Sequence, residues 1–209
     1  SWAEERTHST AEWRIGDGEG GMEVTVRGFV SGLHGLFFGG LFLMAVFGIG
    51  YELFRSRYAK QVPELTERGY RLERVYLIAM AALGWAAVLS GAYVVYPWYR
   101  AVPPAGADLA AYPQRLLMAS AATIEWHSLG MEWKEHVAWF APIAMTMVAY
   151  VVTKYRSAIA EHPGVKRGAI AFTAAALLAA GIAGSWGALI DKAAPVEGGG
   201  TMQVMGGRR

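Results

Sequence analysis

The sequence has no cysteine among its 209 residues. This absence excludes disulfide bonds, iron–sulfur clusters, thiolate metal ligands and cysteine nucleophiles. Charged residues are also scarce: they make up 17% of the chain, against roughly 25% in a typical soluble domain. The net charge of +2 and the lack of a basic stripe argue against nucleic-acid binding. No P-loop, GxSxG or HExxH motif is present. Composition therefore disfavours an ordinary soluble enzyme.

Long apolar runs take the place of the missing charges. Residues 28–51, 75–98 and 168–190 contain no Asp, Glu, Lys or Arg, and residues 137–152 form a shorter run of the same kind. A helix needs about 20 apolar residues to cross a bilayer core. Strands are excluded, because an open strand leaves its amides unpaired in lipid and the alternation of a barrel is missing. The sequence predicts an all-α membrane protein with four transmembrane helices, near 28–54, 75–98, 135–153 and 168–190.

The segments around this transmembrane domain (28–190) are polar. We expect residues 1–27 to lie outside the membrane and the glycine-rich tail 191–209 to be irregular. Residues 22–26 alternate like a brief strand or an extended lead-in. Apolar residues at helical spacing in 113–135 predict an interfacial helix before the third span, or an outward extension of that span. Pro142 should kink the third span or leave a carbonyl free, and Pro163-Gly164 indicates a turn.

Basic residues indicate the orientation of the spans. The two loops between spans one and two and between spans three and four carry ten basic and five acidic residues, and the rest of the chain carries nine and twelve. Short loops rich in Lys and Arg stay in the cytoplasm. Both termini and the long connector 99–135 should then lie on the periplasmic side of what we expect to be a bacterial inner membrane.

Histidines are the main candidates for chemistry. His34 is the only ionisable residue deep inside a long run, and ionisable groups within a membrane are costly enough to suggest a function. The orientation places His127 and His136 on the same side of the membrane. Glu132 and His136 are four residues apart, so on a helix both would face one site. His8 and His162 are expected to be solvated.

Two histidines on different helices suggest haem b, which needs no cysteine and suits a four-helix bundle. We expect His34 and His136 to be the iron ligands, with His127 as the alternative to His136. Gly35 beside His34 would let a flat macrocycle approach, and Trp133 would line its rim. The architecture is similar to that of small four-helix haem b subunits of membrane oxidoreductases, at the level of fold class only.

This hypothesis implies an electron-transfer subunit of a respiratory or photosynthetic redox complex rather than a stand-alone enzyme. Its partners would be the lipid bilayer, other membrane subunits, and a quinol or a periplasmic electron carrier. One alternative is an accessory subunit without a cofactor, in which small residues such as those at 180–187 pack against other helices. Another is a non-haem metal site formed by Glu125, His127, Glu132 and His136. A different tetrapyrrole with a single axial histidine falls between these hypotheses.

Overall fold

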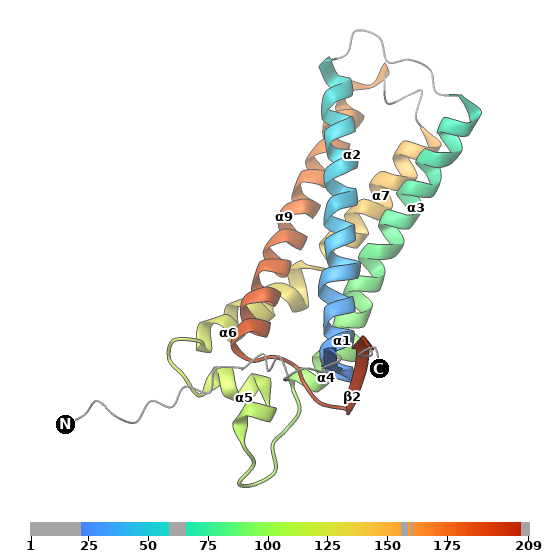
Figure 1. The fold of residues 1–209 in the computed structure, drawn as a ribbon. Coiled ribbons are helices and arrows are strands. Elements are labelled where there is room, and N and C mark those ends of the chain that lie inside the picture. Colours follow the sequence, from blue (N-terminus) through green and yellow to red (C-terminus); the bar gives the residue numbers. More distant parts are fainter. Residues whose placement is uncertain (1–21, 59–65, 156–158, 160, 206–209) are drawn as a thin grey trace, which may run out of the picture.

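The computed structural model describes residues 22–58, 66–155, 159 and 161–205. The expectations for residues 1–21, including His8, lie outside this range. The described helices form an elongated bundle (Figure 1), and about 80% of the described residues are helical, as expected for an all-α protein. Four helices in the described part are long and apolar enough to cross a membrane: Val26–Arg55, Glu67–Tyr99, Ile124–Lys154 and Pro163–Ala193.

Three of the four spans are built from more than one helical segment. Span one comprises α1 (Val26–Gly32), the π-helical η1 (Leu33–Gly39) and α2 (Gly40–Tyr58). Span two comprises α3 (Glu67–Ser90), the π-helical η2 (Gly91–Val95) and α4 (Tyr96–Tyr99). Span three comprises α6 (Ile124–Glu132), the π-helical η4 (Trp133–Val137) and α7 (Phe140–Lys154), whereas span four is the single helix α9 (Pro163–Ala193).

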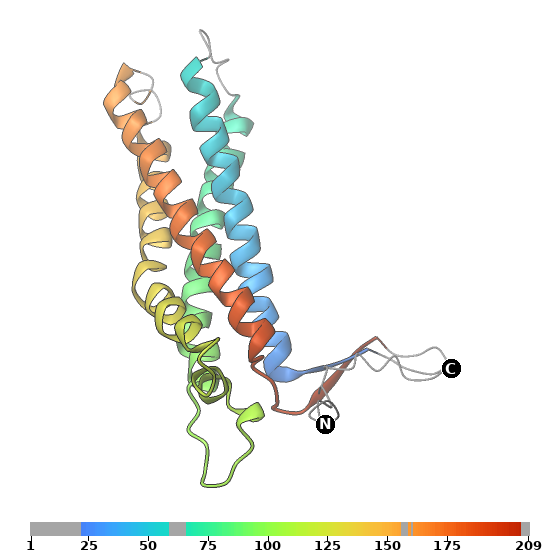
Figure 2. The ribbon, with the colours of Figure 1, turned by 90° about the vertical axis from the view of Figure 1, so that its left-hand side faces the viewer.

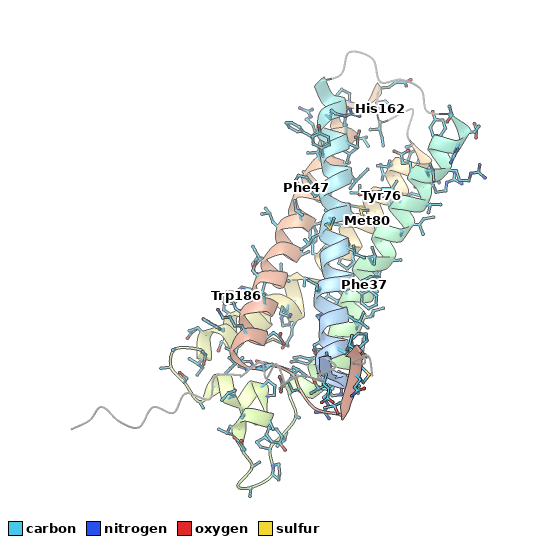
Figure 3. All side chains as sticks on the ribbon, viewed as in Figure 1. Phe37, Phe47, Tyr76, Met80, His162 and Trp186 are labelled. Atoms are coloured by element: carbon cyan, nitrogen blue, oxygen red, sulfur yellow. The ribbon has the colours of Figure 1, made fainter. Side chains whose placement is uncertain are left out.

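The four spans pack in a closed ring, since α2 contacts α3 and α9, and α7 contacts the same two helices. Side chains from all four helices form an apolar core, which includes Val46, Leu77, Met145 and Ala176. Large apolar side chains also cover the outside of the bundle; Leu36, for example, is 83% exposed. An apolar exterior of this extent is unfavourable in water and suits a bilayer. Phe37 and Phe47 belong to this exterior surface (Figure 3).

The bundle has two distinct ends (Figures 1 and 2). The loop end carries the start of α3 and of α9 and the end of α7. The terminal end carries α4, the short helices η3 (Leu109–Ala111) and α5 (Pro113–Met118), α6 and both strands. A second apolar cluster lies there, built from Tyr99, Leu117, Met131, Ile190, Ala194 and Val196. The prediction that residues 113–135 contain helix is therefore confirmed, because α5 and α6 occupy most of this stretch and α6 extends span three.

Prolines explain two of the irregular segments. Span three is interrupted at Ala138 and Trp139, and Pro142 lies one turn further on. Proline has no amide hydrogen and its ring crowds the carbonyl four residues earlier. The Ala138 carbonyl accepts instead from the Ala141 amide at 3.2 Å, and Thr146 Oγ1 donates to the Pro142 carbonyl at 2.7 Å. The η2 segment likewise ends shortly before Pro97. Pro163 begins α9 and does not form the expected turn, since the first position of a helix needs no amide donor.

The two ends of the described chain meet in a small antiparallel sheet. Strand β1 (Met22–Thr25) pairs with β2 (Thr201–Met205), with Thr25 opposite Thr201. The tail expected to be irregular thus contains a strand. The first amides of α1 have no acceptor within the helix, and carbonyl groups of the C-terminal tail take this role. Val26 N–H donates to the Gly200 carbonyl at 3.0 Å, and Arg27 N–H donates to the Gly198 carbonyl at 3.1 Å.

Candidate functional site

Polar side chains gather between the two apolar clusters. In spans two and three, the large cluster ends near Met80 and Ala141, and the cluster at the terminal end begins near Tyr99 and Met131. The segments between them carry hydrogen-bonding and ionisable groups at positions 90, 96, 134 and 135, and His34 of span one packs against the same region. Polar groups in an apolar bundle need partners nearby, so the contacts of each group decide what it can do.

His34 bonds span one to span two. Its Nδ1 lies 3.1 Å from Ser90 Oγ, and Ser90 Oγ donates its hydrogen to the Ala87 carbonyl at 3.1 Å. A hydroxyl has a single hydrogen, so while Ser90 donates to Ala87 it accepts from His34. The neutral imidazole then carries its proton on Nδ1 and keeps a lone pair on Nε2. The Ala87 backbone is also a hydrogen-bond partner of the His34 ring, and among the described residues the hydrogen bonds assigned to individual atoms of the ring involve Nδ1 and not Nε2. Nε2 is thus the nitrogen of His34 that can bind a metal or accept a proton.

Gly91 allows the His34 ring to occupy this position. A Cβ atom at residue 91 would lie 2.6 Å from Cε1 of the ring, 3.2 Å from Nε2 and 3.3 Å from Nδ1. Contacts between carbon atoms are normally about 3.5–4.0 Å, so any side chain at 91 would displace the ring. Ser90 and Gly91 therefore form the surface of span two against which the His34 ring packs. The sequence around these two residues gives no indication of this contact.

Lys134 is the ionisable group that approaches His34 from span three. It is half-buried, and its ammonium lies against Gly187 of α9, where a Cβ would be 2.9 Å from Nζ. Its charge interacts with His34 and with Asp191. Lys134 thus points into the bundle, and this direction fixes the orientation of the η4 segment.

His136 faces away from His34. Residues two apart on a helix lie on nearly opposite sides, so His136 is directed outward when Lys134 is directed inward, and its side chain is 68% exposed. Nδ1 of His136 donates to the Glu132 carbonyl at 3.1 Å and lies 3.2 Å from the Glu132 carboxylate. The expected pairing of Glu132 with His136 is present, but the structure does not bring His136 to His34.

His127 has a partner on each ring nitrogen. Nδ1 lies 2.7 Å from the Tyr99 hydroxyl and Nε2 lies 3.3 Å from the amide nitrogen of Gln114. Tyr99 and Gln114 are buried, so this group holds α4, α5 and α6 together. The structure therefore gives His127 a stabilising role at the terminal end, and iron binding would require it to release one of these two bonds.

A second tyrosine of span two, Tyr96, forms hydrogen bonds with a carboxylate and with an arginine. The Tyr96 hydroxyl donates to Glu135 at 2.5 Å and accepts from Arg100 at 2.9 Å. The Tyr96 and Tyr99 rings are stacked, with centroids 6.4 Å apart. These tyrosines belong to the Tyr-Pro-Trp-Tyr-Arg sequence at the end of span two, whose aromatic and basic composition was the available signal for a polar network.

The other predicted residues are dispersed. Glu125 is exposed on α6, and in the described residues no three His, Asp or Glu side chains lie together as metal ligands. The set Glu125, His127, Glu132 and His136 thus does not converge. Trp133 donates its indole N–H to the Ala179 carbonyl of α9 at 2.9 Å. Gly35 is exposed, and a Cβ added there would meet no other atom within 4 Å.

His162 is exposed at the loop end, at the opposite end of the bundle from Trp186 (Figure 3). Trp186 of α9 packs against Gly130 of α6, where a Cβ would lie 3.1 Å from the indole. This close approach joins span four to the extension of span three. Among the described histidines, His34 therefore remains as the imidazole within the bundle that has an open ring nitrogen.

The η1 segment that carries His34 is irregular without a proline to cause it. Both η2 and η4 precede a proline, whereas residues 33–44 contain none. π-Helical turns are uncommon and are found often at functional sites. Ser31, one turn before His34, has a buried hydroxyl with no hydrogen-bond partner in the described part of the chain. Both features mark the surroundings of His34 as the candidate site.

Comparison with known proteins adds no relative: no protein family model, no curated protein and no solved structure matches the chain. The contacts of His34 and its neighbours are therefore what bears on function.

Proposed function

We propose that the chain is a haem b electron-transfer subunit of a respiratory or photosynthetic membrane complex, with His34 as an axial ligand. One observation carries the proposal: Nδ1 of His34 is held as a donor by Ser90, which leaves the Nε2 lone pair available inside a span. Histidines that bind metals usually have their other nitrogen engaged in this way. Haem, when bound, supplies a one-electron iron couple. The unpartnered Ser31 hydroxyl and the irregular η1 segment fit a bound group beside His34.

The second ligand in this proposal is His136. Its Nδ1 is occupied by Glu132, so its Nε2 is open like that of His34. To bind the same iron as His34, the His136 side chain has to move to the opposite side of its helix, and this requires η4 to rotate. The interruption at Ala138 and Trp139 is the point at which such a rotation disturbs few backbone hydrogen bonds. His127 is the alternative ligand, at the expense of its bond to Gln114 or Tyr99.

Electrons would pass near the terminal end of the bundle. Positive charge at the loop end favours a cytoplasmic location for that end, so the haem would lie nearer the periplasmic face. A quinol in the bilayer or a periplasmic carrier is the matching electron partner. If His127 is the second ligand, η4 keeps its orientation, and the inward-directed Lys134 would balance the negative charge of haem propionates.

A visible spectrum of the natively purified protein tests the proposal. A low-spin bis-histidine haem b should give a Soret shift and an α band after reduction with dithionite. His34→Ala and His136→Ala should each remove the low-spin spectrum, while the exposed loop-end variant His162→Ala should keep it. Ser90→Ala keeps the ligand but removes the acceptor of Nδ1–H, so it should shift the reduction potential and retain haem.

The same series contains the contradicting results. A folded His34→Ala protein with an unchanged bis-histidine spectrum would refute the site. Loss of the low-spin haem in His127→Ala, with His136→Ala unaffected, would move the second ligand to His127. A wild-type protein without haem would remove the proposal and leave His34 as a residue that ties span one to span two.

Open glycines support a second candidate, an accessory subunit without a cofactor. Side chain positions at Gly32, Gly35, Gly40 and Gly181 have no atom within 4 Å in the chain itself. Small residues of this kind let helices of another subunit approach closely. Gly35→Leu and Gly181→Leu should then release the chain from its native complex on a native gel, whereas Leu178→Ala, which trims a side chain that is already exposed and bulky, should not. Retention of both leucine variants would count against this candidate.

A further inference from the structure

A hollow at the loop end lies outside the candidate site. It occupies about 350 Å³ between α3 and α7 and is lined by Arg74, Ile78, Tyr150, Thr153 and Lys154. The two helices pack directly against each other, so the hollow is a depression on their joint surface. It lies where the apolar part of each span gives way to the basic loops, which is the level of lipid headgroups.

Two cations form the mouth of the hollow, and among the described residues no carboxylate lines it. Arg74 and Lys154 are both exposed. The Lys154 ammonium is held in place, because it donates to the Tyr150 hydroxyl at 2.6 Å and lies 5.1 Å and 5.4 Å from the ring centroids of Tyr150 and Tyr155. An ammonium has three N–H donors, so two remain for a ligand. A guanidinium and a fixed ammonium on one depression favour a phosphate group.

The inner part of the hollow is apolar. Ile78 lies one turn further into span two than Arg74, and its side chain is 61% exposed. Tyr150 lies one turn further into span three than Lys154 and presents its ring on the same side. The hollow thus has cations at the membrane surface and apolar side chains toward the bilayer centre. A free anion would contact only the cations, whereas a phospholipid matches both the cations and the apolar side chains.

We infer that this hollow binds an anionic phospholipid, with the headgroup phosphate between Arg74 and Lys154 and an acyl chain along Ile78. Basic pockets between helices on the cytoplasmic side of membrane proteins bind such headgroups. The inference is independent of haem, because the hollow shares no residue with the surroundings of His34.

Native mass spectrometry of the full chain in detergent tests the site, with phosphatidylglycerol as the probe and phosphatidylcholine as the neutral comparison. A basic residue close to an anionic headgroup contributes about fivefold to the binding of that lipid, and the contribution falls off with distance. Arg74→Gln and Lys154→Gln should each weaken phosphatidylglycerol binding about fivefold, and the double variant should bind more weakly than either single variant. Lys154→Arg keeps the charge and should retain most of the binding. Both positions are exposed, so the variants should fold normally.

Arg68→Gln is the matched control, since it removes an exposed charge from the same helix without touching the hollow. Equal weakening by Arg68→Gln would reduce the effect to diffuse attraction and overturn the site. Equal binding of phosphatidylcholine would do the same. Inorganic phosphate should not displace the lipid, and Ile78→Ser should weaken lipid binding. Displacement by millimolar phosphate, with Ile78→Ser unchanged, would instead make this a site for a soluble anion and overturn the lipid assignment.

Discussion

The contact between His34 and Gly91 leads to a prediction that does not depend on a cofactor. A methyl group at residue 91 would lie 2.6 Å from Cε1 of the ring, so the ring has to shift, and we expect the shift to break its bond to the neighbouring Ser90. Losing that bond removes roughly 1 kcal/mol, and the added volume removes roughly 1–3 kcal/mol. Alanine recovers about 1 kcal/mol of helix propensity over glycine. Gly91→Ala should therefore lower the free energy of unfolding by about 1–3 kcal/mol.

Reversible unfolding in detergent micelles, followed by tryptophan fluorescence, measures this difference. Gly35→Ala is the control, because a methyl at 35 meets no atom within 4 Å and should leave stability unchanged or raise it. In a His34→Ala background the penalty of Gly91→Ala should vanish, since the ring it strikes is gone. A Gly91→Ala protein as stable as the wild type, or one equally destabilised with and without His34, would show that the ring does not lie against residue 91.

Three further outcomes are expected. Trp85→Phe removes the indole donor to Thr146, a bond of 3.0 Å, and should reduce the unfolding free energy by about 1 kcal/mol; no loss in the same unfolding assay would contradict that bond. Pro142→Ala supplies an amide to span three, so hydrogen exchange around residues 138–142 should slow, and unchanged exchange would mean that proline is not the cause of the interruption. Because the chain lacks cysteine, Glu161→Cys and Ala105→Cys each create a single labelling site. An impermeant maleimide should label only position 105 in intact cells, and labelling at 161 would reverse the proposed orientation.

The helical spans could be predicted because lipid imposes strong demands on a sequence. Apolar runs of sufficient length and the need to pair every backbone amide leave few alternatives. Helix ends were less predictable: α9 begins at Pro163, where a turn was expected, and α3 begins at Glu67, well before the apolar run at 75. In both cases polar residues continue a helix beyond the membrane, and hydropathy carries no information about that.

The surroundings of His34 were only partly predictable. Its depth in the membrane is visible in the sequence, but its hydrogen-bond partner Ser90 is 56 residues away on another span. The pairing of Glu132 with His136 was predicted because it is local to one helix. The direction of that pair was not, because it depends on how η4 is turned by the inward-facing Lys134.

The sheet of β1 and β2 has a consequence for the order in which the protein matures. The ribosome synthesises β1 before the first span and β2 after the last span. The carbonyls of Gly198 and Gly200, which cap the start of span one, therefore become available only after the last span has been synthesised. All four spans must be inserted before this closure can form. The adjacency of Met22 and Met205 in the sheet also makes the bundle suitable for circular permutation: a link between residues 22 and 205 that replaces residues 1–21 and 206–209, with the chain opened near residue 105, should preserve every span.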